Sequence, residues 1–228
     1  MDEAFGRRAA TLAALADPLR RALYRFVAEQ PGAVSRDQAA EGVEVPRHTA
    51  KFHLDRLVDE GLLVPEFRRL SGRTGPGAGR PAKLYRRARK EVSVSLPSRR
   101  YDLAGQVLAD AVERALDGTP MVEALDDAAV AAAQVVATSY GDAPPSLFDA
   151  LSRLGYEPRD EGAIRLGNCP YDRLAADHSE LICSVNERFV TSLCSTLGGA
   201  EPVTRTGTGP SPAGCCVRIG GKDGSTTP

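Results

Sequence analysis

Residues 46–63 read PRHTAKFHLDRLVDEGLL, and this stretch decides the fold of the first part of the chain. Pro46 favours the start of a helix and Gly61 favours its end, so the stretch predicts a helix that stops near Glu60. At about 100° per residue, three apolar side chains share one stripe of that helix: Ala50, Leu54 and Leu57. This stripe predicts packing against other helices and leaves a polar face exposed.

Two shorter helices are predicted upstream. Asp17-Pro18 combines a capping carboxylate with a first-turn proline, and Pro31-Gly32 ends the helix that follows. Ser35 and Gln38 have the spacing of a capping box, and Gly42 ends this second helix. Two helices separated by a short turn are the pattern of a helix-turn-helix.

A basic hairpin follows the third helix. Residues 62–65 and 83–86 predict two strands, and residues 72–81 form a Gly/Pro-rich tip between them. Such a hairpin is a wing.

Charge is distributed unevenly along the chain. Residues 66–100 contain 11 Lys/Arg and 2 Asp/Glu. Residues 1–100 contain 20 Lys/Arg and 12 Asp/Glu (net +8), whereas residues 101–228 contain 9 Lys/Arg and 18 Asp/Glu (net −9). The formal net charge of −1 therefore joins a basic half to an acidic half, and the basic half predicts a nucleic-acid surface.

The third helix and the wing supply the predicted DNA contacts. The first turns of a recognition helix meet base edges in the major groove, where Lys or Arg can pair with guanine and Phe52 can touch a thymine methyl. Arg56 is expected to contact phosphate, and the cations of the wing are expected to contact phosphate or the minor groove. The predicted contacts are Arg47, His48, Thr49, Lys51, Phe52, Arg56, Arg73, Arg80 and Lys83. The alternative is a solvated helix face beside a basic loop that binds nothing.

Three segments carry a resemblance to a known family. ALADPLRRALYRFV (14–27), PRHTAKFHLDRLVDEGLL (46–63) and GRPAKLYRR (79–87) resemble the ArsR-type winged helix-turn-helix regulators over residues 8–90. The resemblance implies a homodimer that reads an inverted-repeat operator in double-stranded DNA. The cysteines with which the arsenic and cadmium sensors of that family bind metal have no counterpart, because the first cysteine is Cys169.

The second half contains all five cysteines. The chain has no signal peptide or apolar run long enough to span a bilayer, so we expect a cytoplasmic protein with reduced thiols. Thirteen residues separate Cys169 from Cys183 and 31 separate Cys183 from Cys215, which excludes a short-spaced zinc finger but suits an iron–sulfur cluster. Cys194 follows Cys183 on one predicted helix by about 16 Å, too far to share a small cluster.

Cys215 and Cys216 are predicted to begin a final strand, where neighbouring side chains point to opposite faces. Only one of the two should then reach the site, unless the chain bends after Gly214. The predicted metal ligands are Cys169, Cys183 and Cys215 or Cys216, with the other cysteine or a non-cysteine group as a fourth ligand. His178 is one such candidate, although a lone histidine at a helix start is more often a surface residue.

The segments LGNCPYDRLAADHSELICSVNERFV (166–190) and GCCVRI (214–219) resemble the C-terminal domain of SufR-type regulators. The resemblance implies an iron–sulfur repressor that senses iron, redox, oxidative or nitrosative state, with ligands at Cys169, Cys183 and the Cys215/Cys216 region. Zinc is a weaker alternative cofactor. The same cysteines are also compatible with a small-ligand site, a thiol switch or thiols that are merely packed. A thiol-redox enzyme would need an exposed cysteine of low pKa.

These patterns predict an α+β protein: an N-terminal winged helix-turn-helix domain, a helical connector and a C-terminal α/β sensory domain. The predicted domains are residues 1–95, a connector or dimerisation segment at 96–145, a cysteine-containing domain at 146–220 and a disordered tail at 221–228. Residues 99–117 and 121–140 predict the connector helices, and residues 201–214 a loop. No nucleophile–base pair or phosphate loop is recognisable, so we expect no catalytic residues.

Overall fold

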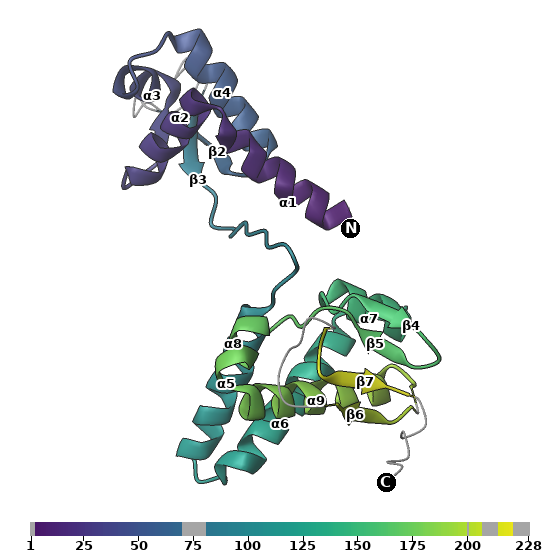
Figure 1. Ribbon diagram of the computed structural model, residues 1–228. Helices are drawn as coiled ribbons and strands as arrows, with labels where there is room; N and C mark the ends of the chain where they lie inside the picture. Colours follow the sequence, from purple (N-terminus) through teal and green to yellow (C-terminus); the bar gives the residue numbers. More distant parts are fainter. Residues whose placement is uncertain (1–2, 70–80, 200, 207–213, 221–228) are drawn as a thin grey trace, which may run out of the picture. The chain divides into compact units, whose positions relative to one another are not determined.

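The computed structural model describes residues 3–69, 81–199, 201–206 and 214–220. The chain divides into two compact units, Met1–Val94 and Ser95–Pro228 (Figure 1). Arg73, Arg80 and the predicted tail at 221–228 lie outside the described residues. Within those residues, no helix combines the length and apolar character needed to cross a membrane.

The helices of the N-terminal unit begin where their capping residues predict. Asp17 accepts a 2.9 Å hydrogen bond from the Arg20 backbone N–H at the start of α2 (Pro18–Glu29). Ser35 and Gln38 form the predicted capping box at the start of α3 (Arg36–Gly42). Two elements that the sequence patterns do not predict precede α2, namely α1 (Glu3–Ala13) and the 3₁₀ helix η1 (Ala14–Ala16).

Helix α4 (Arg47–Asp59) carries the predicted apolar stripe. Ala50, Leu54 and Leu57 are fully buried, and they join Leu23 of α2 in the core of the unit. The stripe prediction is therefore confirmed. Lys51, Phe52 and Arg56, which lie between the stripe positions, are exposed and available for a partner.

A small antiparallel sheet completes the N-terminal unit. Its strands are β1 (Val34–Ser35), β2 (Leu63–Arg68) and β3 (Ala82–Arg87), in the order β1-β3-β2. Strands β2 and β3 pair from Leu63–Arg87 to Arg68–Ala82. The two predicted wing strands are confirmed, whereas β1 has no counterpart among the predicted elements. The tip between the wing strands lies almost wholly in residues that the structure leaves undescribed.

The C-terminal unit contains five helices and four strands in its described part (Figure 1). The helices are α5 (Tyr101–Leu116), α6 (Met121–Thr138), α7 (Leu147–Arg153), α8 (Asp172–Asp177) and α9 (Ser179–Thr196). The strands are β4 (Pro158–Asp160), β5 (Ile164–Leu166), β6 (Val203–Arg205) and β7 (Val217–Ile219). They form an antiparallel sheet in the order β4-β5-β7-β6.

Helix α9 is the centre of this unit. It packs against α6 on one side and against β6 and β7 on the other, and α5 packs along α6. One apolar core runs through all these elements and includes Phe189, Val190 and Leu193 of α9. The sequence-based division into a connector at 96–145 and a separate domain at 146–220 is therefore wrong. Helix α6 packs against α9 and α5 packs along α6, and buried residues of both helices belong to the same apolar core, so both helices are part of this unit.

Three further expectations need correction. The predicted loop at residues 201–214 contains a strand, because Val203–Arg205 form β6. Helix α7 is absent from the prediction, although Ser146 caps it by accepting a hydrogen bond from the Asp149 backbone N–H. The last strand begins at Val217 and not at Cys215. All three segments are short and are stabilised by packing in the unit rather than by a long periodic pattern.

Candidate nucleic-acid interface and cysteine pocket

The exposed face of α4 presents most of the predicted DNA contacts. Arg47, His48, Lys51 and Arg56 are exposed, and Thr49 is half-buried. Phe52 is 65% exposed, which is unusual for a large apolar side chain and leaves its ring free to contact a partner. Pro46 and Glu44, which has a positive φ of 56°, form the turn that leads into the helix.

Each described cation among the predicted contacts is paired with a carboxylate of the same unit. Arg47 Nε lies 3.3 Å from Asp37 Oδ1, and Arg56 Nη2 lies 2.6 Å from Glu60 Oε1. Lys51 and Lys83 share the carboxylate of Asp55. An exposed pair such as Arg47–Asp37 contributes little to stability, so phosphate can compete for that cation.

Asp55 joins the recognition helix to the wing. Its Oδ1 accepts hydrogen bonds from Lys83 Nζ at 2.6 Å and from the Tyr85 hydroxyl at 2.8 Å, and its Oδ2 accepts one from Lys51 Nζ at 3.0 Å. Partial burial opposes ionisation of Asp55, but the hydrogen bonds from Lys83, Lys51 and Tyr85 outweigh it and lower its pKa to about 2. No sequence pattern indicates this role, because Lys83 and Tyr85 are distant from Asp55 in the chain.

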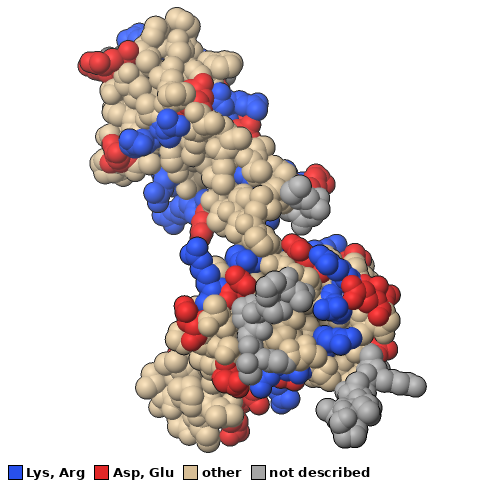
Figure 2. All heavy atoms as spheres, in the orientation of Figure 1, with Lys and Arg blue, Asp and Glu red and all other residues tan. Residues whose placement is uncertain are grey.

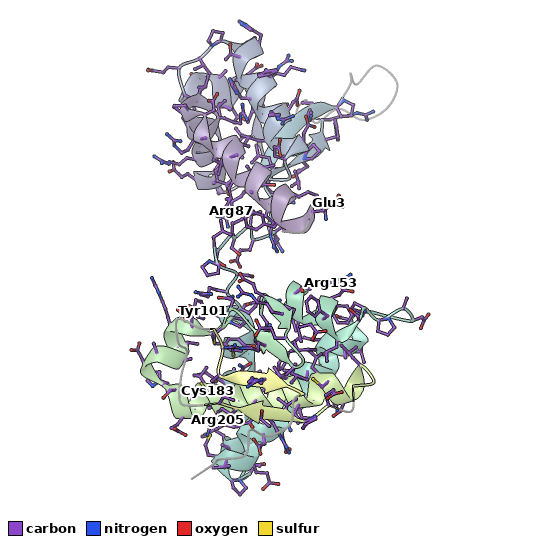
Figure 3. The ribbon with its side chains drawn as sticks, turned by 45° about the vertical axis from the view of Figure 1, so that its right-hand side comes forward. Glu3, Arg87, Tyr101, Arg153, Cys183 and Arg205 are labelled. Carbon is purple, nitrogen blue, oxygen red and sulfur yellow. The ribbon has the colours of Figure 1, made fainter. Side chains whose placement is uncertain are left out.

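The cysteine pocket is assembled from three segments of the C-terminal unit. Cys169 lies between β5 and α8, Cys183 lies near the start of α9, and Cys215 and Cys216 immediately precede β7. Figure 3 labels Cys183 on α9, the helix that packs against β7. Cys169, Cys183 and Cys216 are buried and Cys215 is partly buried, and none of them forms a disulfide.

The thiols interact in one continuous series, from Cys169 to Cys215, from Cys215 to Cys216, and from Cys216 to Cys183. The hydrogen bond with Cys215 lowers the pKa of Cys169, and a second hydrogen bond with Cys215 lowers the pKa of Cys216. The contact with Cys169, followed by that with Cys216 and by burial, raises the pKa of Cys215. The structure thus brings all four predicted ligands together.

Gly214 explains why both Cys215 and Cys216 reach the pocket. Its φ is +117°, and a Cβ at this position would lie 2.4 Å from the Leu166 carbonyl oxygen. The Cys215 backbone N–H donates a 2.8 Å hydrogen bond to that same carbonyl. This bend places the two cysteines before the regular strand, and it is the exception under which both of them were expected to reach the site.

Two buried polar side chains support the pocket. Asn186 lies on α9 and its Nδ2 donates a 3.3 Å hydrogen bond to Cys215 Sγ. The Tyr156 hydroxyl donates a 2.5 Å hydrogen bond to Asn186 Oδ1, and burial raises the pKa of Tyr156 well above its usual value. Neither residue was among the predicted site residues. The position of Asn186 on the apolar face of α9, three residues after Cys183, was the one available signal.

Cys194 and His178 do not contribute to the pocket. The continuous helix α9 contains both Cys183 and Cys194, as the spacing argument requires. Burial raises the pKa of Cys194 to about 11, and no other thiol contributes to that rise. His178 is exposed at the junction of α8 and α9. Among the described residues, no three His, Cys, Asp or Glu side chains are arranged to hold a single metal ion.

Comparison with known proteins bears on the first of these two sites. Residues 15–66 match the family model described as a helix-turn-helix domain. The matched residues lie within the N-terminal unit. The match spans the helices from η1 to α4 and enters β2, and it supports a DNA-binding transcription regulator of the ArsR type. No curated protein and no solved structure matches the chain.

Proposed function

We propose that the protein is a homodimeric transcriptional repressor whose affinity for an inverted-repeat operator is controlled by an iron–sulfur cluster. The single observation that carries the cluster proposal is the meeting of Cys169, Cys183, Cys215 and Cys216 from three separate segments, with Cys194 left out. The helix-turn-helix domain supplies the DNA-binding function. The signal proposed for the cluster is iron, redox, oxidative or nitrosative state.

The donor set fits an iron–sulfur cluster better than zinc. Structural zinc needs four ligands that converge on one ion at about 2.0–2.3 Å, and the described residues hold no such single-ion site. The four thiols would hold an iron–sulfur cluster through more than one iron, so they need not converge on a single metal ion.

When bound, the cluster would supply a centre that gains or loses electrons and can be taken apart by oxidants. The protein residues then set its properties. The Asn186 amide donates to Cys215 Sγ, and such hydrogen bonds to sulfur tune the reduction potential. The buried Tyr156 holds that amide in place.

An exposed apolar end of the α5–α6 hairpin supports the homodimer. Leu116 is 82% exposed, and Val122 and Met121 are also exposed. Figure 2 shows an area without charged side chains over this end of the C-terminal unit. Apolar side chains gathered at one exposed end mark a protein–protein contact, and a second copy of the chain is the partner that the proposal requires.

Salt-dependent DNA binding tests the regulator. A Lys51→Ala variant should bind duplex DNA more weakly, and the slope of log K against log salt should fall by about one. Arg165→Ala removes the same charge from β5 in the other unit and should leave the slope unchanged. A wild-type protein that shows no salt-dependent binding to duplex DNA would refute the regulator.

Anaerobic purification of cysteine variants tests the cluster. Iron and sulfide should be present in matching amounts in the wild type, lost in Cys169→Ser and Cys183→Ser, and retained in Cys194→Ser. Equal loss in all three variants would contradict the assignment of the pocket. Zinc without sulfide would favour the zinc alternative. A protein that stays colourless after reconstitution would leave a small ligand or a thiol switch as the remaining alternatives for the regulatory site.

A further inference from the structure

The segment that enters the C-terminal unit is bonded to the segment that carries Cys169. Residues 98–101 lie alongside residues 168–173 through a series of hydrogen bonds. Asn168 Nδ2 donates to the Ser98 carbonyl at 2.9 Å, and the Arg100 N–H donates to the Pro170 carbonyl at 3.0 Å. Figure 3 labels Tyr101 at the start of α5, where this contact ends.

Asn168 is buried and its side chain is fully used by this contact. Nδ2 donates a second hydrogen bond to the Gly155 carbonyl at 2.6 Å, and Oδ1 accepts one from Arg99 Nη1 at 2.5 Å. A buried amide with all its groups bonded has one favourable orientation. Asn168 therefore ties three backbone segments together one residue before the proposed ligand Cys169.

Arg99 contacts the same loop at several points. Its Nη1 lies 3.3 Å from the Cys169 carbonyl oxygen, in addition to its bond to Asn168, and its Nη2 lies 3.5 Å from Asp172 Oδ2. The side chain is only 19% exposed. A planar guanidinium that bridges several acceptors fixes their relative positions in a way that a lysine cannot.

The other end of this contact is the chain that links the two units. The boundary between them falls at Val94 and Ser95, and the Arg99 N–H donates a 2.8 Å hydrogen bond to Ser95 Oγ. Gly155 allows Ser98 to approach closely, because a Cβ on Gly155 would lie 2.7 Å from the Ser98 side chain. The linker is thus held to the loop of Cys169 at its first residues in the C-terminal unit.

We propose that Arg99 and Asn168 are positioning residues that couple the Cys169 loop to the linker of the helix-turn-helix domain. The proposal rests on the proposed function for its signal. A change in what Cys169 binds alters the position of its carbonyl and of Asn168, and both are bonded directly to residues 98 and 99. The linker then changes the freedom with which two helix-turn-helix domains meet two half-sites.

The test compares operator affinity with and without cluster in Arg99→Ala. Allosteric coupling is typically about 5–150-fold, and in this variant the ratio of holo to apo affinity should fall towards one while iron and sulfide content stays at the wild-type level. Arg99→Lys keeps the charge but not the bridge and should give an intermediate ratio. Arg100→Ala is the matched control, because its side chain pairs with Asp102 and should leave the ratio unchanged.

Hydrogen exchange in the cluster-free protein tests the same contact without a cofactor. Arg99→Ala should speed exchange of the amides of Asn168, Arg100 and Asp172, and Arg100→Ala should do so much less. Unchanged exchange of these amides in Arg99→Ala would overturn the inference, as would a wild-type affinity ratio in that variant. If wild-type affinity is indifferent to the cluster, the proposed function fails, and the exchange result alone decides the inference.

Discussion

Asp55 on the recognition helix and Lys83 on the wing strand form a 2.6 Å ion pair across 28 positions of sequence. The same carboxylate holds Lys51 and the Tyr85 hydroxyl. One acidic residue thereby links the helix to the hairpin and neutralises two cations that we expect to contact DNA phosphate. We therefore expect Asp55 to stabilise the fold and to weaken DNA binding.

Asp55→Asn should lower the free energy of unfolding of the N-terminal unit by about 1–2 kcal/mol, because it weakens charge-assisted hydrogen bonds that are only partly screened by solvent. Thermal unfolding of both proteins at neutral pH measures the loss. Asp59→Asn, at an exposed position of the same helix, is the control and should change stability little. Equal effects of the two substitutions would contradict a role for Asp55 in holding the wing.

The stabilising effect of Asp55 should also depend on pH with a defined sign. Its pKa is lowered to about 2 in the folded protein, while an unfolded carboxyl titrates near ~4. The ionised form therefore stabilises the fold, fully above about pH 4 and progressively less as the pH falls towards 2. The difference in Tm between wild type and Asp55→Asn should shrink over that interval. A constant difference would exclude ionisation as its cause.

DNA affinity should change in the opposite direction. Asp55→Asn releases Lys51 and Lys83 for phosphate, so non-specific duplex binding should tighten and its salt dependence should steepen. Fluorescence anisotropy across a salt series measures both quantities. Weaker binding with an unchanged slope would mean that the position of the lysines matters more than their release.

The sequence predicted the helix-turn-helix well because its determinants are local. Asp17 and the Ser35–Gln38 box cap the helices that contain or follow them, and the stripe of α4 repeats every three to four residues. The role of Asp55 could not be predicted, because its determinants are not local. In the sequence it is one more charge four residues after Lys51, and only the pairing of β2 with β3 brings Lys83 and Tyr85 to it.

The cysteine pocket could be predicted in part. Helical spacing predicted that Cys194 and Cys183 lie too far apart to share one cluster, and both residues do lie on the continuous helix α9. The relation between Cys215 and Cys216 could not be obtained from strand geometry, because the left-handed bend at Gly214 precedes β7. Arg99 and Asn168 lie 69 positions apart, and no local pattern connects them.

Gly214→Ala should disrupt the pocket without removing a thiol. Alanine is strained at a φ of +117°, and its Cβ would meet the Leu166 carbonyl at 2.4 Å. Bound iron and sulfide should therefore fall sharply after reconstitution, while the variant should bind DNA as the cluster-free wild type does. Gly162→Ala, at a φ of +78° with open space around it, controls for backbone strain alone. Equal iron content in the two variants would argue against a role for the bend.

Tyr156→Phe should destabilise the C-terminal unit by about 1–3 kcal/mol, because it leaves the buried Asn186 Oδ1 without its hydrogen bond. Asn186 then loses the partner that orients its amide towards Cys215. The reduction potential of the reconstituted protein should shift relative to the wild type. Tyr140→Phe, on a half-buried tyrosine outside the pocket, should leave the potential in place. If Tyr156→Phe and Tyr140→Phe have the same reduction potential, Tyr156 does not tune the cluster.

We expect the exposed end of the α5–α6 hairpin to form the contact between the two copies of the homodimer. If Leu116 and Val122 are buried against a second copy, a glutamate at either position loses about 1.5–3 kcal/mol of apolar burial, which weakens the dimer about tenfold or more. Sedimentation velocity over a concentration series measures this shift towards monomer. Val135→Glu changes another exposed apolar residue of α6, farther from the hairpin end, and should leave the dimer intact. If Leu116→Glu and Val135→Glu sediment alike as dimers, the two copies meet through another surface.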